Sequence, residues 1–347
     1  MRGLGGRWKI GTLTSKYTFE NSMLPIEKFP KIDAHFHSTF NDSRYQKIAG
    51  AFNVRYININ TDADVFPSLE TQEQVALSYA NASPQHFAYI CSFEMNNWTE
   101  TNWYNDVLAS IKKSIQNGAV GIKIWKNIGM GILKPDRSFL MIDDPFFIPL
   151  FEFLQENKIP VLAHLGEPKN CWLPLEKMTS RRNRAYYEKH PAFHAYLHPE
   201  IPSYQRQIAA RDAILETFPD LTLVGAHLGS MEWSYEELAK RFDKYPNFSV
   251  DISSRLGHLQ MQAAQHPEKI RDFFIQYADR IMYGTDAYNN HEKLETSLIN
   301  DWKYFTTREY CQSTEVDGLF QGIQLPEEVL YKLYFSNAKT IYSRLVF

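Results

Sequence analysis

Two histidines separated by a single residue, His35 and His37, are the first feature of the sequence that could do chemistry. They end an apolar run that begins at Lys31 and is typical of a buried strand. Residues i and i+2 of a strand project from the same face, so both imidazoles would point the same way. Such a pair can bind a divalent metal ion, although a pair on a surface turn usually has no such role.

Other ionisable residues also end strand-like runs. His164 ends VLAH, His227 ends LVGAH, and Asp286 follows MYGT. Each has an ordinary explanation when it is taken alone. A histidine at a strand end is usually a hydrogen-bonded polar residue, and an aspartate there can cap the following helix.

Lys123 lies in GIKIW, where Ile122 and Ile124 would face the covering helices and the lysine would face the interior. A buried ammonium group without a partner is costly, so it implies an acidic, metal-bound or anionic neighbour. The alternative is a lysine at a strand end whose ammonium group reaches water. A hydrophobic core does not need this many ionisable groups. A divalent cation would resolve their repulsion, because neutral imidazoles and a carboxylate are its natural ligands.

Eight short apolar runs alternate with amphipathic stretches of helical length. The runs begin at Lys31, Asn53, His86, Ala119, Ile159, Leu221, Asn247 and Arg280. This alternation predicts parallel βαβ units in an α/β fold, which close most simply into a distorted (β/α)8 TIM barrel. The ionisable residues would then meet at the C-terminal mouth of the barrel. A doubly wound sheet would normally carry a glycine-rich loop where His35 and His37 stand.

The chain of 347 residues fits one such domain with additions at both ends. We predict an N-terminal arm over residues 1–30, a barrel core over 31–306, and a C-terminal extension over 307–347 with a helix from Pro326 to Val346. Residues 167–203 form a long connection after the fifth strand, rich in aromatic residues and without an evident helix. We expect this connection to be an ordered lid.

Composition restricts the partners. The net charge of −3, without a basic stripe, argues against nucleic acid, and no apolar run is long enough to span a membrane. Three cysteines without a CxxC pair and the absence of a signal-peptide pattern favour the cytoplasm. We expect a small-molecule substrate. A homodimer through the N-terminal arm or the C-terminal helix stays open.

The ordered set of motifs resembles the amidohydrolase superfamily, in the amidohydrolase-related branch that includes lactonases, amide hydrolases and non-oxidative decarboxylases. The resemblance covers about residues 30–345 and is carried by Asp33-Ala34-His35-Phe36-His37, Gly121-Ile122-Lys123, Ala163-His164, Ala226-His227-Leu228-Gly229 and Tyr283-Gly284-Thr285-Asp286-Ala287. The ordered set is specific, whereas any single motif is not.

The resemblance implies one divalent metal ion held by His35, His37, His164 and Asp286. Zinc is the first choice, and manganese or iron would accept similar ligands. The resemblance also implies that Asp286 and His227 are catalytic. Asp286 would take a proton from an activated water, and His227 would stabilise the oxyanion or bind a second metal ion beside a carboxylated Lys123.

We therefore expect the hydrolysis of an amide, lactone or ester of a small carboxylated molecule. Near the predicted mouth, substrate contacts are assigned to Lys126, Glu167, Lys169, Trp172 and Arg255, where the cations suit an acid group. A merely solvated loop explains these charges equally well. Asp251 ends the seventh strand and is expected to support a ligand histidine. One alternative is a metal-dependent non-oxidative decarboxylase on the same scaffold. A second is a non-catalytic metal-binding or ligand-binding barrel.

Overall fold

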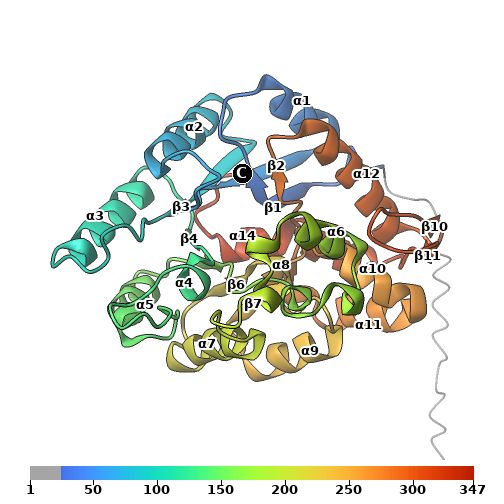
Figure 1. The fold of residues 1–347 in the computed structure, drawn as a ribbon. Helices are drawn as coiled ribbons and strands as arrows, with labels where there is room; N and C mark the ends of the chain where they lie inside the picture. Colours follow the sequence, from blue (N-terminus) through green and yellow to red (C-terminus); the bar gives the residue numbers. More distant parts are fainter. Residues whose placement is uncertain (1–24) are drawn as a thin grey trace, which may run out of the picture.

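A parallel sheet of nine strands winds round the centre of the molecule, with helices outside it, in a computed structural model that describes residues 25–347 (Figure 1). Residues 1–24 of the predicted N-terminal arm lie outside the described residues. The strands are β1 Lys31–His37, β2 Val54–Ile59, β3 Phe87–Ser92, β4 Ile122–Ile124, β5 Val161–Ala163, β6 Leu223–Gly225, β7 Phe248–Asp251, β8 Ile281–Met282 and β9 Ala287–Tyr288. Their spatial order follows the chain from β1 to β8, and β9 lies beside β1. This arrangement confirms the predicted distorted (β/α)8 barrel.

The closure of the barrel differs from the sequence prediction of eight strands. The last predicted run, which begins at Arg280, forms only the short β8, and an additional strand, β9, follows Asp286 and pairs in parallel with Phe36 and His37. Between them, the amide of Ala34 donates to the carbonyl of Tyr283 (3.0 Å) and the amide of Asp286 donates to the carbonyl of His35 (2.7 Å). The interruption closes the barrel while leaving Asp286 in the left-handed region, at φ 54°.

Helices cover the outer face of the sheet. The principal ones are α1 Ser43–Phe52, α2 Leu69–Ala82, α3 Trp103–Gln116, α5 Ile148–Glu156, α7 Tyr204–Thr217, α9 Tyr235–Lys244, α10 Leu256–Gln265, α11 Pro267–Gln276 and α12 His291–Thr306. Helix α9 follows its sequence signals closely: the hydroxyl of Ser234 accepts from the amide of Glu237, and basic residues occupy the last turn. No helix in the described part of the chain is long and apolar enough to cross a membrane.

The C-terminal segment closes the end of the barrel at which the strands begin. It consists of α13 Glu327–Tyr331, a π-helical turn over Lys332–Ser336 and α14 Asn337–Ile341, in place of the single predicted helix from Pro326 to Val346. The helix ends where Tyr342 leaves helical geometry, at φ −95° and ψ 67°. The buried Tyr342 ring packs with strand residues such as Ile32 and Leu162. The terminal residues therefore seal the end of the barrel opposite to the strand ends that carry the histidines.

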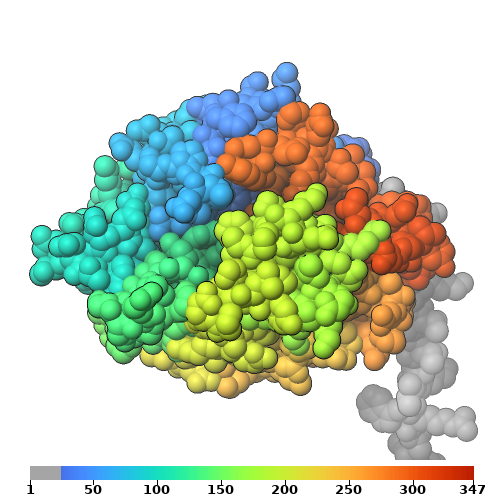
Figure 2. Space-filling view, viewed as in Figure 1, coloured from blue at the N-terminus to red at the C-terminus, as the bar shows by residue number. Residues whose placement is uncertain are grey.

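The lid, residues 167–203, is ordered but not free of helix as its sequence suggested. It contains α6 Arg181–Lys189 and four short 3₁₀ turns, and the hydroxyl of Ser180 caps α6 by accepting from the amide of Asn183 (3.3 Å). Cys171, Met178, Tyr187 and Ala195 form a small buried core of its own. Figure 2 shows the lid in yellow-green, between the blue and cyan first units and the red C-terminal hairpin of β10 Tyr310–Cys311 and β11 Phe320–Gln321.

The end of β6 leaves no room for a side chain at Gly225. A methyl group there would lie 2.7 Å from Cα of Gly229 and 2.9 Å from the Phe248 ring. We expect Gly225→Ala to lower the free energy of unfolding by about 1–3 kcal/mol through overpacking, measured by urea denaturation.

Gly50→Ala is the matched control, because a methyl group at Gly50 in α1 would meet nothing within 4 Å. That variant should be unchanged or more stable by up to about 1 kcal/mol, owing to the higher helix propensity of alanine. Wild-type stability in Gly225→Ala would contradict the packing described for the end of β6.

Candidate metal centre

The ends of four strands bring four histidines and one aspartate to the mouth of the barrel. His35 and His37 end β1, His164 follows β5, His227 follows β6, and Asp286 lies between β8 and β9. Ring centroids are separated by 5.2 Å for His35 and His37, 4.7 Å for His35 and His227, and 4.4 Å for His164 and His227. The structure therefore brings His35, His37 and His227 into one group by ring contacts, and His164 joins this group through the ring of His227.

Asp286 lies at the centre of this group. Its Oδ1 is 3.7 Å from Nε2 of His35 and 3.5 Å from Nε2 of His37. His35, His227 and Asp286 each offer a ligand atom, and the three atoms lie within 4.8 Å of one another. The Asp286 side chain is 28% exposed, so solvent reaches the carboxylate. Burial opposes its ionisation, but the surrounding histidines, His227 first, hold the pKa of Asp286 well below its ordinary value.

Three of the imidazoles are held through Nδ1. Nδ1 of His37 lies 2.9 Å from the carbonyl of Ile59, and Nδ1 of His227 lies 2.8 Å from the carbonyl of Ser253. Nδ1 of His35 lies 2.9 Å from the carboxylate of Asp251. Because a carbonyl or carboxylate can only accept, each Nδ1 is the donor, and each neutral ring keeps its lone pair on Nε2. That lone pair is what a metal ion needs.

The charge state of the rings agrees with their tautomers. Burial, followed by the neighbouring His35, lowers the pKa of His37 to about 3. Burial and then His35 also lower the pKa of His227 well below its ordinary value. Neutral imidazoles around an ionised carboxylate form a donor set that fits zinc and similar divalent ions.

Two further groups lack a partner in the described structure. Nδ1 of His164 is buried without a hydrogen bond, and its ring meets the Trp125 ring edge-on at 4.8 Å between centroids. Nζ of Lys123 is also buried and unpartnered, and burial lowers the pKa of Lys123 to about 8 against the opposing effect of Asp251. Unpartnered buried polar groups are costly. Lys123 lies near Asp286 and His164 lies near His227, so both fit a site that is completed by a bound group.

The backbone around the histidines is strained. Four consecutive residues after β6 take left-handed conformations: His227 and Leu228 at φ 59°, and Gly229 and Ser230 at φ 58°. Conformations of this kind cost roughly 1–2 kcal/mol for each residue other than glycine, so the surroundings must impose them. Nη1 of the buried Arg211 donates to the carbonyl of Gly229 (2.5 Å), and the hydroxyl of Tyr204 donates to the carbonyl of Ser230 (2.6 Å).

Asp251 contacts a candidate ligand histidine, as its sequence position suggested. Its Oδ2 takes the hydrogen bond from His35, and its Oδ1 accepts from the amides of His227 and Ser253, each at 3.0 Å. One carboxylate therefore orients the ring of one candidate ligand and the backbone of another.

Sequence reasoning missed several supporting residues. Oγ of Ser253 lies 3.0 Å from Nδ1 of His35 and 2.9 Å from Nδ1 of His227. The hydroxyl of Ser254 donates to Oδ2 of Asp286 (2.7 Å). Asp33 accepts from the amides of His35 (3.1 Å) and Thr285 (2.9 Å), which joins β1 to the segment after β8. The only available signal for Ser253 was that it stands two residues after Asp251, where both would share a strand face.

Of the five residues proposed for substrate contacts, three gather near His164. Lys126 forms an ion pair with Glu167, and Nη2 of Arg255 lies 3.9 Å from Oε2 of Glu167. Both cations lie close enough to His164 to contribute to lowering its pKa. Beside them, the buried carboxyl of Glu232, which the sequence did not single out, has its pKa raised by burial to about 7.

The other two residues belong to the packing of the lid. The Lys169 ammonium lies 3.4 Å from the centroid of the Trp233 ring. The Trp172 indole donates to the carbonyl of Pro202 (3.1 Å), and its ring packs against Tyr204 at 5.6 Å. Neither side chain has a described contact with the histidine group, so their assignment to the substrate remains a prediction.

Comparison with known proteins agrees with the geometry. The family model described as amidohydrolase matches residues 99–344, which is more than half of the chain. The comparison with curated protein sequences gives no match.

Three solved structures with low sequence identity share the fold. An uncharacterized TIM-barrel protein from Bordetella bronchiseptica aligns with a TM-score of 0.54 at 16% identity, covering 91% of this chain and 99% of that one. 2,6-Dihydroxybenzoate decarboxylase from Rhizobium gives 0.55 at 14% identity, with 91% and 99% covered. 5-Carboxyvanillate decarboxylase from Sphingomonas paucimobilis gives 0.51 at 11% identity, again with 91% and 99% covered.

The role of Asp251 can be tested through metal affinity. Asp251→Asn removes the charge that orients His35, so we expect zinc affinity to fall by about 10–100-fold. Competition with a fluorescent chelator measures the affinity, and circular dichroism checks the fold. Asp279→Asn is the control, because that carboxylate is 73% exposed and pairs with Lys332. A folded Asp251→Asn protein with wild-type zinc affinity would show that Asp251 does not support the site.

Proposed function

Because the chain belongs to the amidohydrolase family, we propose that it is a metal-dependent hydrolase in which water attacks a carbonyl of a small, carboxylated molecule. The observation that carries the proposal is an ionised Asp286, reached by solvent, among neutral imidazoles that keep their Nε2 lone pairs. This combination provides both a ligand set and a proton acceptor at one position. The bond cleaved is that of an amide, a lactone or an ester.

One divalent ion is assigned to His35, His37, His164 and Asp286, with zinc first and manganese or iron as other candidates. When bound, such an ion supplies Lewis acidity and lowers the pKa of water to about 7. His227 is the reserve ligand, since its ligand atom lies within 4.8 Å of those of His35 and Asp286.

The protein's own residues then handle protons and charge. The Asp286 carboxylate takes a proton from the attacking water and returns it to the leaving group. Ser254 holds the other oxygen of that carboxylate at 2.7 Å, which fixes its orientation. His227 stands beside Asp286 and His35. Its Nδ1–H is taken by the carbonyl of Ser253, so the ring stabilises the oxyanion that forms on the substrate when Nε2 carries a proton.

The acid group of the substrate is assigned to the His164 side of the centre. Lys126 and Arg255 approach there from different elements and share Glu167. Nε of Arg255 is buried without a partner, so the guanidinium has a donor left for a ligand. An arginine fork and an ammonium group suit a carboxylate.

Non-oxidative decarboxylation is the second candidate. It is favoured by the fold shared with 2,6-dihydroxybenzoate decarboxylase. The products distinguish the two reactions: hydrolysis incorporates ¹⁸O from labelled water, whereas decarboxylation releases carbon dioxide. Hydrolysis ranks first because Asp286 is placed to receive a proton from water.

Asp286→Asn should lower kcat by at least about 10²–10⁴-fold, because the amide cannot accept the proton. A panel of carboxylated lactones, amides and esters supplies the assay, with metal content measured by elemental mass spectrometry. The wild type should hold about one equivalent of metal. Asp279→Asn is again the control. Full activity in Asp286→Asn would remove the aspartate from the mechanism.

Arg255→Met should raise KM for a carboxylated substrate by about tenfold or more, since a hydrogen bond to a charged group is lost. For the corresponding amide or methyl ester, the KM of the same variant should equal that of the wild type. Lys169→Met provides the comparison, because the Lys169 ammonium is occupied by the Trp233 ring. An equal rise in KM for charged and neutral substrates would contradict the assignment of the acid group to Arg255.

A further inference from the structure

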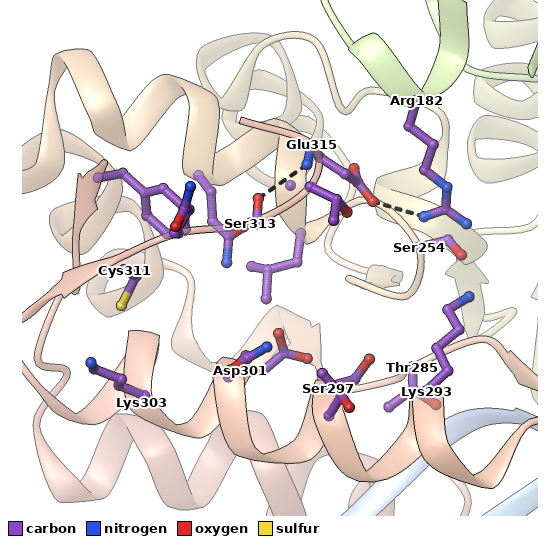
Figure 3. A pocket seen from close by; sticks show the side chains of 18 of the residues that line it. Arg182, Ser254, Thr285, Lys293, Ser297, Asp301, Lys303, Cys311, Ser313 and Glu315 are labelled. Carbon is purple, nitrogen blue, oxygen red and sulfur yellow. Dashed lines mark hydrogen bonds and ion pairs between the residues drawn. The ribbon is translucent and has the colours of Figure 1, made fainter. Parts of the chain in front are cut away.

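A large cavity with both polar and apolar side chains adjoins the candidate metal centre without being part of it. It has a volume of about 1270 Å³ and lies between α10, α12 and the segment that carries β10 and β11, where α6 of the lid borders it (Figure 3). Its lining includes Ser254 and Thr285. Thr285 directly precedes Asp286, and Ser254 donates a hydrogen bond to the Asp286 carboxylate. The inner end of the cavity is therefore separated from the centre by these small residues.

Two cations converge on this inner end. Figure 3 shows Arg182, from α6, and Lys293, from the first turn of α12, pointing toward each other across the cavity beside Ser254. Burial, followed by the neighbouring Arg182, lowers the pKa of Lys293, so the two charges are close enough to repel. Bringing two cations together without an anion between them is unfavourable.

The carboxylates of the region leave this end with a positive charge. Arg182 pairs with Glu315 at 2.7 Å, and the same carboxylate also acts on Lys293, which forms no ion pair of its own with any described residue. One carboxylate therefore serves two cations. Asp286 also acts on Lys293, but that carboxylate is committed to the metal centre. Glu292 lines the cavity too, but it acts on Arg44, which lies outside the lining.

The rest of the cavity is different in character. Asp301 lies eight residues after Lys293 on α12, about 12 Å further along the helix axis. It accepts from the hydroxyl of Tyr283 (3.0 Å). Lys303, two residues beyond, pairs with Glu309 at 2.9 Å. Ser297 and Asn300 add neutral polar groups between the two ends. The unbalanced positive charge is thus confined to the end that adjoins Asp286.

We propose that Arg182 and Lys293 form a second anion subsite, which binds an acid group of a substrate that carries two. This inference rests on the proposed function, because the reacting carbonyl would lie at Asp286 with one acid group near Arg255. The substrate class is then a small dicarboxylic acid derivative. The Arg182 guanidinium stays anchored to Glu315, and the Lys293 ammonium supplies the charge that has no other partner.

The test measures binding and does not require turnover. Metal-loaded full-length protein is titrated calorimetrically with dicarboxylates from succinate to suberate, and with the monocarboxylate of the same length as each. We expect one of the dicarboxylates to bind more tightly than its monocarboxylate. Lys293→Met should weaken that dicarboxylate by about tenfold, as the loss of one charge-assisted hydrogen bond predicts, and should leave the monocarboxylate bound at Arg255 unchanged.

Two further variants separate a binding role from a general effect of charge. Lys303→Met removes the same charge from the same helix at the far end, and should leave dicarboxylate binding unchanged. Glu315→Gln removes the negative charge that pairs with Arg182. The variant should therefore bind the dicarboxylate more tightly.

The inference is overturned if no dicarboxylate binds better than its monocarboxylate, if Lys293→Met binds as the wild type does, or if Lys303→Met weakens binding equally. Dicarboxylate binding that depends on Lys293, in a protein that hydrolyses nothing in the panel, would keep the subsite and reject the hydrolase. Hydrolysis in the panel together with dicarboxylate binding that is insensitive to Lys293 would keep the hydrolase and reject the subsite.

Discussion

The buried carboxylate of Asp251 is the interaction on which the candidate metal centre depends. It stands at the end of β7 and meets donors from three places: the His35 ring on β1, the His227 amide after β6, and the Ser253 amide beyond its own strand. Burial alone would make this charge costly. The hydrogen bonds and neighbouring histidines outweigh that cost, and the pKa of Asp251 lies below its ordinary value. The same contacts fix the ring of His35 and the backbone of His227 and Ser253 at once.

The strained backbone near Asp251 arises because strand ends must direct their side chains into the mouth of the barrel. A strand end must turn sharply to aim a ring into the mouth, and His227 does so at the start of a left-handed turn, while Asp286 is left-handed between β8 and β9. Neither turn is stable by itself. Arg211 and Tyr204, both on α7, hold the first through backbone carbonyls, and the amide of Asp286 holds the second through His35. The barrel thus uses its outer helices to maintain the conformations that its inner site requires.

Much of this arrangement could be predicted from the sequence because it depends on periodicity. Alternation along GIKIW placed Ile122 and Ile124 in the outer core and left Lys123 buried beside Asp251 and Asp286, as the structure has it. The apolar runs marked the strands, and polar residues at their ends marked one mouth. Such patterns are local. Because the C-terminal ends of all strands in a parallel barrel meet at one mouth, residues that are far apart in the sequence come to lie close together.

What could not be predicted depends on contacts between distant segments. The β9 pairing exists because the chain after Asp286 meets the end of β1. Ser254 matters only because its hydroxyl reaches a residue 32 positions away. Lys169 and Trp172 have the side chains of substrate-binding residues, yet Lys169 lies over Trp233 of another loop, and Trp172 donates to Pro202, 30 residues further along the lid. Helix α6 was missed because its polar sequence has few apolar positions, with only Asn183 and Tyr187 buried.

Positive and negative groups alternate across the mouth of the barrel. Cations stand on the His164 side, where Lys126 and Arg255 share one carboxylate, and again behind Ser254, where Lys293 has no ion pair. Between them lies the ionised Asp286. An extended ligand with its negative charges at both ends and a neutral, electrophilic centre matches this alternation, whereas a cationic ligand would meet repulsion at both ends. Under the proposed function, this placement of charge would select a ligand with an acid group at each end and would set its neutral carbonyl at Asp286.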